Sequence, residues 1–121
     1  MEKKKVSLVI PMYYEEEVAN ECYEKVSNVL KGLEDTYDYE IIFVNDGSKD
    51  KTLEILEEIA KKDEKAKIVS FSRNFGHQAA VTAGLKEVTG DAIVIIDADL
   101  QDPPELIPEM LKYWEEGYDD V

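Results

Sequence analysis

The chain lacks the features that mark secreted or membrane-spanning proteins. Among its 121 residues there is one cysteine, Cys22, so no disulfide forms within the chain and a reducing compartment is the simpler expectation. No stretch approaches the ~18 apolar residues of a membrane span. The charged start at 1–5 leads into a short apolar run instead of a signal-peptide core. We therefore expect this chain to be soluble and cytoplasmic.

Basic residues are also scarce. Fourteen Lys and Arg against 28 Asp and Glu give a formal net charge of -14, which as a whole repels nucleic acid and anionic lipid. Much of the acidic charge lies in helical stretches at 15–31 and 54–65, where it forms solvated faces. The three lysines at 3–5 could touch anionic lipid, but they are more typical of a soluble sheet edge. Nucleic acid is excluded as a partner, and any anionic ligand must meet a local cation or metal.

Several nucleotide-binding patterns are absent. A dinucleotide-binding domain needs Gly-x-Gly-x-x-Gly in its first strand-to-helix turn, where this chain has PMYYE at 11–15, and there is no P-loop. A response-regulator domain needs acids directly after its first strand and a phosphoacceptor aspartate after its third. This chain has Arg73 at the latter place. These classes of α/β protein are therefore disfavoured.

Four apolar runs rich in β-branched residues are present, at 6–10, 40–45, 67–72 and 92–96. Each is followed by a helical pattern; the apolar positions of the patterns are Val18, Cys22, Val26, Val29, Leu30 and Leu33, then Leu53, Leu56, Ile59 and Ala60, then Ala79, Ala80, Ala83, Leu85 and Val88, then those of 106–114. This order, βαβαβαβα, predicts a doubly wound α/β fold, a mostly parallel sheet with helices on both faces. The unbroken run at 92–96 is typical of a central strand.

We expect a single domain, 1–121, because no low-complexity linker divides the chain. Gly117 is expected near a helix C-cap, followed by a new extended segment, so the sequence suggests a piece of a longer protein. A sheet cut short would leave an unpaired edge and apolar surface, which favours self-association.

The segment DADLQD at 97–102 closes the last apolar run, where a strand end reaches solvent. Ligands of α/β folds bind at the carboxyl ends of strands, and the oxygens of Asp97, Asp99 and the amide of Gln101 suit Mg²⁺ or Mn²⁺. Asp102, followed by two prolines and Glu105, is instead expected to cap the next helix.

Other polar groups follow the remaining strands. Tyr13 could pack against a planar base, and the acids from Glu15 onward suit either a ligand or a helix start. Asp46 lies in turn-forming sequence whose Ser48 or Asp50 is an N-cap candidate, and its carboxylate could accept the imide N–H of uracil.

After the third run, the sequence SRNFG at 72–76 places a cation at a helix N-terminus. Backbone N–H groups together with Arg73 predict an anion site, with Asn74 as a cap candidate. His77, the sole histidine, is expected to be an exposed first-turn residue in preference to a catalytic one. Because the strand ends share one sheet edge, these groups together describe a nucleotide-diphosphate site.

The motifs VIPMY at 9–13 with the acids at 15–16, VNDGS at 44–48, SRNFG at 72–76 and DADLQDPPE at 97–105 match a known family. In these motifs the chain resembles the amino-terminal half of inverting family 2 glycosyltransferases with the GT-A fold. It is most similar to the polyprenyl-phosphate sugar transferases, the group of dolichyl-phosphate mannose synthase and bactoprenol glucosyl transferase. The pattern departs at Tyr14, where many relatives have asparagine.

The resemblance implies a role for each matched position. Pro11, Tyr13, Glu15 and Asp46 would line the base pocket of a UDP- or GDP-sugar, with Arg73 near the same edge. Asp97 would lie near the ribose or the metal. Asp99 and Gln101 would bind Mn²⁺ or Mg²⁺, which neutralises the diphosphate leaving group.

The resemblance also implies what this chain does not contain. In the family, the acceptor site, the catalytic base and the membrane-associated helices follow the metal motif, so we expect the base beyond Val121 and the parent protein at the cytoplasmic face of a membrane, acting on a lipid phosphate. An inverting transfer needs that base or an anionic acceptor, so this chain alone should not turn over. The alternatives are a non-catalytic nucleotide-binding module and a glycosyltransferase with a polysaccharide or other non-lipid acceptor.

Overall fold

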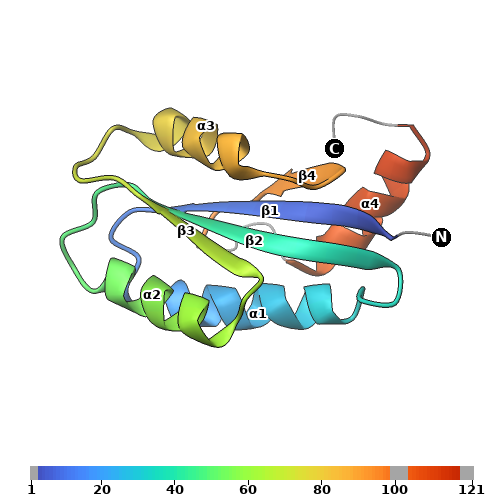
Figure 1. Cartoon of the computed structure of the whole chain (residues 1–121), viewed down its shortest axis with the longest axis horizontal. Coiled ribbons are helices and arrows are strands. Elements are labelled where there is room, and N and C mark those ends of the chain that lie inside the picture. Colours follow the sequence, from blue (N-terminus) through green and yellow to red (C-terminus); the bar gives the residue numbers. More distant parts are fainter. Residues whose placement is uncertain (1–2, 99–103, 118–121) are drawn as a thin grey trace.

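The computed structural model describes residues 3–98 and 104–117, and in them strands alternate with helices (Figure 1). The elements are β1 (Lys4–Met12), α1 (Ala19–Lys31), β2 (Tyr37–Asn45), α2 (Thr52–Lys62), β3 (Ala66–Ser70), α3 (His77–Glu87), β4 (Ala92–Ile95), the short 3₁₀ helix η1 (Pro104–Leu106) and α4 (Ile107–Glu115). The predicted βαβαβαβα order is confirmed. Gly117 has φ 101° and donates to the Trp114 carbonyl at 3.0 Å, so it ends α4 as predicted.

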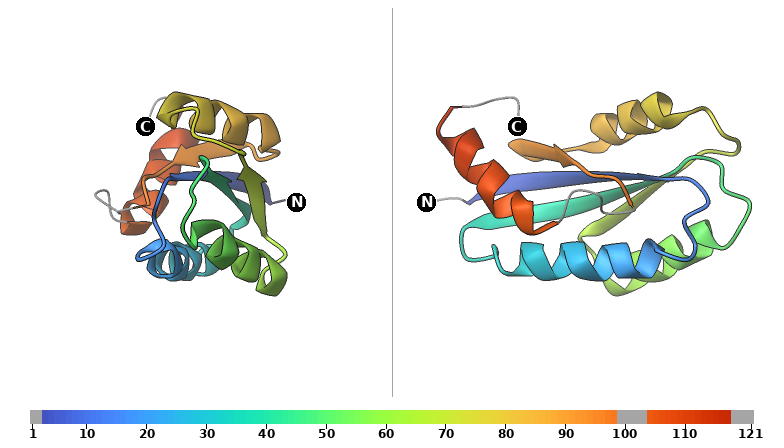
Figure 2. Two further views of the ribbon diagram at one scale, coloured as in Figure 1. Left: turned by 90° about the vertical axis from the view of Figure 1, so that its left-hand side faces the viewer. Right: turned by 180° about the vertical axis from the view of Figure 1, so that it is seen from behind.

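The sheet is parallel and its strand order is β3-β2-β1-β4. The chain moves outward from β1 to β2 and β3, and then returns across the sheet to β4, which is the doubly wound arrangement that we predicted. Helix α3 covers one face, and α1 and α2 cover the other (Figure 2). All four β-to-α connections therefore leave the sheet at its carboxyl edge.

Alternation along the strands divides the core between the two faces. On the α1 and α2 side, a large apolar cluster includes Leu8, Ile10 and Phe43, all without solvent exposure, and it also receives α4. On the α3 side the cluster is small; its buried members are Val9, Ile42, Val44 and Ala80. Helix α3 therefore covers β1 and β2 on its face of the sheet and leaves Ile93 and Ile95 of β4 exposed.

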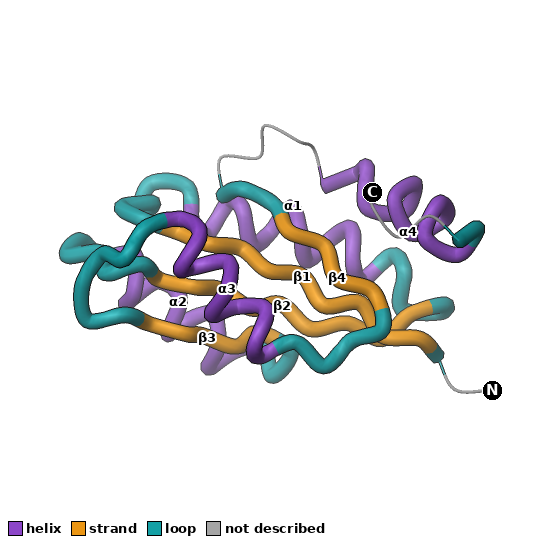
Figure 3. Tube along the Cα trace, turned by 90° about the horizontal axis from the view of Figure 1, so that it is seen from above, coloured by secondary structure: helices purple, strands orange, loops and turns teal. Residues whose placement is uncertain are grey.

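The position of β4 corrects one expectation. The run at 92–96 suggested a central strand, but among the described residues β4 pairs only with β1 and lies at the edge of the sheet (Figure 3). Its side chains alternate, and Ile93 and Ile95 are 46% and 45% exposed on the α3 side. An apolar run in the sequence predicts that a strand is buried, but it does not predict which neighbouring element covers that strand.

The three lysines at the start give a second correction. Lys4 and Lys5 belong to β1, which lies between β2 and β4 and not at a sheet edge. The Lys4 Nζ lies 5.1 Å from the Trp114 ring centroid, and the Lys5 Nζ donates to Thr89 Oγ1 at 2.7 Å. Lys4 and Lys5 therefore connect the amino end of β1 to α4 and to the segment before β4.

The sequence analysis missed a buried carboxylate in β2. Glu40, 2% exposed, accepts hydrogen bonds from Ser7 Oγ at 2.6 Å and Lys67 Nζ at 2.7 Å, and from the Thr89 amide at 2.7 Å, with Lys5 Nζ at 3.5 Å. Burial raises the pKa of Glu40, but the hydrogen bonds from Lys67, Ser7 and Thr89 and the charge of Lys5 outweigh it and lower the pKa to about 2. Glu40 thereby joins β1, β2, β3 and the segment before β4.

In the part of the chain that the structure describes, no helix has the length and apolar character needed to cross a membrane.

Candidate functional site

The carboxyl edge of the sheet carries a pocket of about 290 Å³. Five of the predicted residues line it, from three different strand ends: Pro11, Tyr13, Glu15, Asp46 and Asp97. Ligand pockets usually span roughly 300–1,000 Å³, so this one suits part of a nucleotide sugar, such as its nucleoside. The structure thus brings together most of the residues that the sequence singled out.

The loop after β1 is held by the loop after β2. The Tyr14 amide donates to Ser48 Oγ and the Glu15 amide to Thr52 Oγ1, both at 2.9 Å. Directly before these two anchors, the Tyr13 ring meets the Tyr14 ring edge-on, with 4.6 Å between the ring centroids, and stays 47% exposed. An aromatic face is therefore presented at the pocket by a backbone that hydrogen bonds keep in place.

Tyr14 has φ 54°, in the left-handed region that L-residues with bulky side chains rarely adopt. Asparagine tolerates this conformation better, because its short polar side chain bonds locally. The departure from the family pattern at this position therefore places a residue with a higher backbone cost where the turn requires a positive φ.

Asp46 is 3% exposed and its carboxylate already has protein partners. Oδ1 accepts from the Phe75 amide at 2.8 Å, and Oδ2 accepts from the Gly76 amide at 3.1 Å and from Asn74 Nδ2 at 2.9 Å. Asn74 was expected to cap α3, but it binds Asp46, and the N-cap residue is Gly76 with φ 100°. The anion at this helix N-terminus is thus the protein's own carboxylate.

Gly47 lets the loops after β2 and β3 touch. Its φ is 76°, and a Cβ built on it would lie 2.2 Å from the backbone carbon of Arg73. Only glycine fits both the angle and the contact. Neither cap candidate is the N-cap of α2, which is Lys51. Asp50 Oδ1 accepts from the Thr52 amide at 3.0 Å, one residue before that cap, and Ser48 binds Tyr14.

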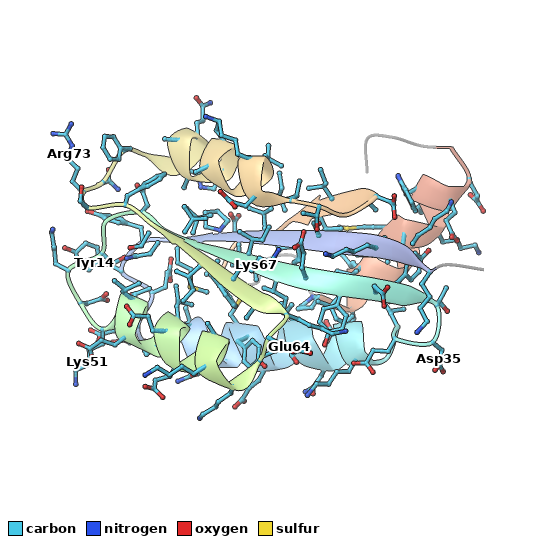
Figure 4. All side chains as sticks on the ribbon, in the orientation of Figure 1. Tyr14, Asp35, Lys51, Glu64, Lys67 and Arg73 are labelled. Carbon is cyan, nitrogen blue, oxygen red and sulfur yellow. The ribbon has the colours of Figure 1, made fainter. Side chains whose placement is uncertain are left out.

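Arg73 does not enter the pocket. It is exposed, and it points outward from the end of the molecule near Tyr14 (Figure 4). Its guanidinium carbon lies 4.9 Å from the centroid of the Phe75 ring. Asp46 accepts from the Phe75 and Gly76 amides, so these two N–H groups are used within the protein. The predicted anion site of Arg73 with backbone N–H groups stays a prediction.

Asp97 follows β4 and is exposed at the pocket. The other predicted metal ligands, Asp99 and Gln101, lie outside the described residues, as does the predicted cap Asp102. Within residues 3–98 and 104–117 no three His, Cys, Asp or Glu side chains are grouped so as to hold a metal ion. Asp97 contributes carboxylate oxygen to the site, the ligand type of a hard cation.

His77 and Asn74 also line the pocket, and the sequence analysis assigned neither to it. His77 is exposed and is the first residue of α3, as predicted, and it borders the pocket at the sheet edge. Asn74 lies in the same strand-to-helix connection as Arg73, and His77 is the helix residue that follows this connection. That part of the sequence was therefore the available signal for both residues, and the nucleotide contact predicted for Arg73 stays a prediction.

Two relatives in sequence resemble this chain closely. An uncharacterized glycosyltransferase, YkcC, of Bacillus subtilis is 54% identical over 95% of this chain and 35% of its own length. A prophage bactoprenol glucosyl transferase homolog of Escherichia coli is 46% identical over 97% of this chain and 38% of its own length. The chain thus spans little more than a third of the length of these curated relatives.

Solved structures share the fold. The mannosyltransferase PcManGT of Pyrobaculum calidifontis, determined in complex with GDP-Man and Mn²⁺, superposes with a TM-score of 0.77 at 22% identity over 93% of this chain and 33% of its own. The architecture is the nucleotide-binding half of a GT-A fold, as predicted. The model of glycosyl transferase family 2 matches residues 7–121, and this chain belongs to that family.

Proposed function

We propose that this chain is the nucleotide-sugar-binding part of a metal-dependent inverting glycosyltransferase, whose whole protein transfers a sugar to a polyprenyl phosphate or a related acceptor. The observation that carries the proposal is the pocket lined jointly by Pro11, Tyr13, Glu15, Asp46 and Asp97. Family membership supports the transferase class. The named bactoprenol relatives support the lipid acceptor.

Each side chain has a stated part in this proposal. Tyr13 packs its ring against the base. Asp46 Oδ1 accepts one protein hydrogen bond, so it retains capacity for the imide N–H of a uracil or the ring N–H of a guanine. Asp97 binds the ribose or, with Asp99 and Gln101, the metal. Mg²⁺ or Mn²⁺ bound there supplies Lewis-acid neutralisation of the diphosphate leaving group.

Calorimetric titration tests the binding half of the proposal. UDP and GDP are titrated with Mn²⁺, with Mg²⁺ and with EDTA, and we expect binding that requires the metal. Asp97→Asn should weaken it at least about tenfold, since a carboxylate ligand is lost. Asp38→Asn is the control, because Asp38 is an exposed carboxylate near the amino end of β2, far from the pocket. Absence of binding, or binding that ignores both metal and Asp97, would contradict the proposal.

A transfer assay separates enzyme from binding module. The 121-residue chain with UDP-glucose and a polyprenyl phosphate should show no transfer, because the catalytic base is predicted beyond Val121. Robust turnover by this chain would overturn that assignment of the base. A longer chain of the same protein that binds the nucleotide sugar without transfer would favour the module.

A further inference from the structure

The pocket has a charge imbalance. Three of its lining side chains, Glu15, Asp46 and Asp97, are carboxylates, and the chain as a whole carries a net charge of -14. No lysine or arginine is among the described residues that line it. Arg73, the cation that the sequence offered, points outward. Besides the proposed metal, a phosphate in the pocket therefore needs a donor other than Arg73.

Most nitrogen donors of the loop before α3 are already used. The Phe75 and Gly76 amides donate to the Asp46 carboxylate, and Asn74 Nδ2 donates to it as well. Of the described lining side chains, only Asn74 and His77 carry nitrogen. Among these lining side chains, the imidazole of His77 is therefore the nitrogen donor that remains. It carries an N–H in both its neutral and its charged form.

His77 lies at the end of the pocket where Asp97 lies, which is the end that we assign to the phosphates. His77 also lines the adjoining hollow between α3 and β4, together with Ile95. Ile95 and Asp97 are two residues apart and both exposed, so they follow the alternation of β4 toward the α3 side. His77 is thereby on the side of β4 and Asp97, whereas Pro11 lies in β1 and Tyr13 directly follows it.

We propose that His77 is a phosphate-binding residue, whose imidazole N–H donates a hydrogen bond to a phosphate oxygen of the bound nucleotide. This inference rests on the proposed function. It assigns to a histidine at the first position of α3 the contact that the sequence suggested for Arg73.

A nucleoside series tests the assignment. Uridine, UMP and UDP are titrated calorimetrically with Mg²⁺, which favours oxygen ligands and so keeps the imidazole out of metal coordination. The guanosine series is used if GDP binds more tightly. His77→Ala should weaken UMP and UDP about tenfold, the scale of a hydrogen bond to a charged group, and leave the nucleoside unchanged. His77→Gln, which keeps an N–H donor, should retain most of the affinity.

Gln78→Ala is the matched control, because Gln78 lines only the adjoining hollow. Thermal melts of each variant confirm folding. Equal losses for uridine and UDP would overturn the assignment in favour of a packing role, and unchanged UDP affinity in His77→Ala would also overturn it. If the unaltered chain binds neither nucleotide series, the proposed function fails and the His77 assignment falls with it. If it binds UDP normally and only the His77 effect is missing, the proposed function stands.

Discussion

At the scale of single residues, Asp46 joins structure and ligand binding. Its carboxylate holds the loop before α3 through the Phe75 and Gly76 amides and Asn74, yet the same side chain lines the pocket. A ligand that donates to Asp46 would meet a group whose position is already set. Pre-positioned acceptors bind without a further ordering cost.

Glu40 gives a prediction on acid stability. Its pKa lies at about 2 in the folded chain against an ordinary 4.5, so its stabilisation is present above pH 4.5 and is lost as the pH falls toward 2. From the size of that shift, the loss is on the order of 3 kcal/mol of unfolding free energy. Urea unfolding of the wild-type chain and Glu40→Gln at pH 5, 4, 3 and 2 measures it.

The comparison between the two chains is what counts, because the other carboxylates titrate in both. We expect the stability advantage of the wild-type chain over Glu40→Gln to shrink steadily through this pH range. A constant difference between pH 5 and pH 2 would show that the Glu40 pKa is not depressed.

Tyr14 gives a prediction on backbone cost. With φ 54°, Tyr14→Asn and Tyr14→Ala both lose the ring contact with Tyr13, but asparagine tolerates the left-handed conformation. We expect the Asn variant to be more stable than the Ala variant by roughly 1 kcal/mol in denaturant unfolding. Equal stabilities would mean that the turn relaxes to a negative φ.

At the scale of elements, loops held against one another build the site. The loop after β1 is bonded to Ser48 and Thr52, and the loop after β3 to Asp46, so the segments around β2 are the common support. Helix α3 adds a close contact at Gly84, where a Cβ would lie 2.6 Å from Val9 Cγ1. The strand ends determine where the pocket lies. The contacts between the loops determine which side chains line it.

Gly47→Ala should disrupt this support. Beyond the roughly 1–2 kcal/mol cost of a left-handed L-residue, the new methyl group meets the backbone of Arg73 and Asn74. Gly76→Ala is the matched control, with φ 100° but no atom within 4 Å of its Cβ. We expect Gly47→Ala to lose more unfolding free energy and to speed hydrogen exchange at the Phe75 amide. Equal effects of the two variants would argue against a loop contact at Gly47.

At the scale of the whole molecule, β4 leaves apolar surface beside an edge that the described residues do not pair. Self-association through this edge remains a prediction. The net charge of -14 opposes it, so raising the salt should promote it by screening. Sedimentation at 0.05 M and roughly 0.5 M NaCl should show concentration-dependent association mainly at the higher salt.

Ile95→Lys should abolish that association, because it places a charge on the exposed face of β4. Leu85→Lys is the comparison, since Leu85 is 39% exposed on α3 and not on the sheet. Association that survives Ile95→Lys, or that Leu85→Lys removes equally, would place the contact elsewhere.

The sequence by itself determined the order of elements, the parallel sheet and the edge at which the site lies. These follow from local periodicity and from the geometry of strand-to-helix connections. With the family resemblance of the motifs, Pro11, Tyr13, Glu15, Asp46 and Asp97 could be selected before any coordinates.

Only the tertiary structure determined which side chains at that edge line the pocket and which hydrogen bonds they make. Arg73 points outward and His77, the first residue of α3, lines the pocket, although the two are close in sequence. Glu40 is buried because lysines from two other strands reach it, and β4 has an exposed face because only β1 pairs with it among the described residues. Such outcomes depend on partners distant in sequence, and residue type and spacing do not encode those partners.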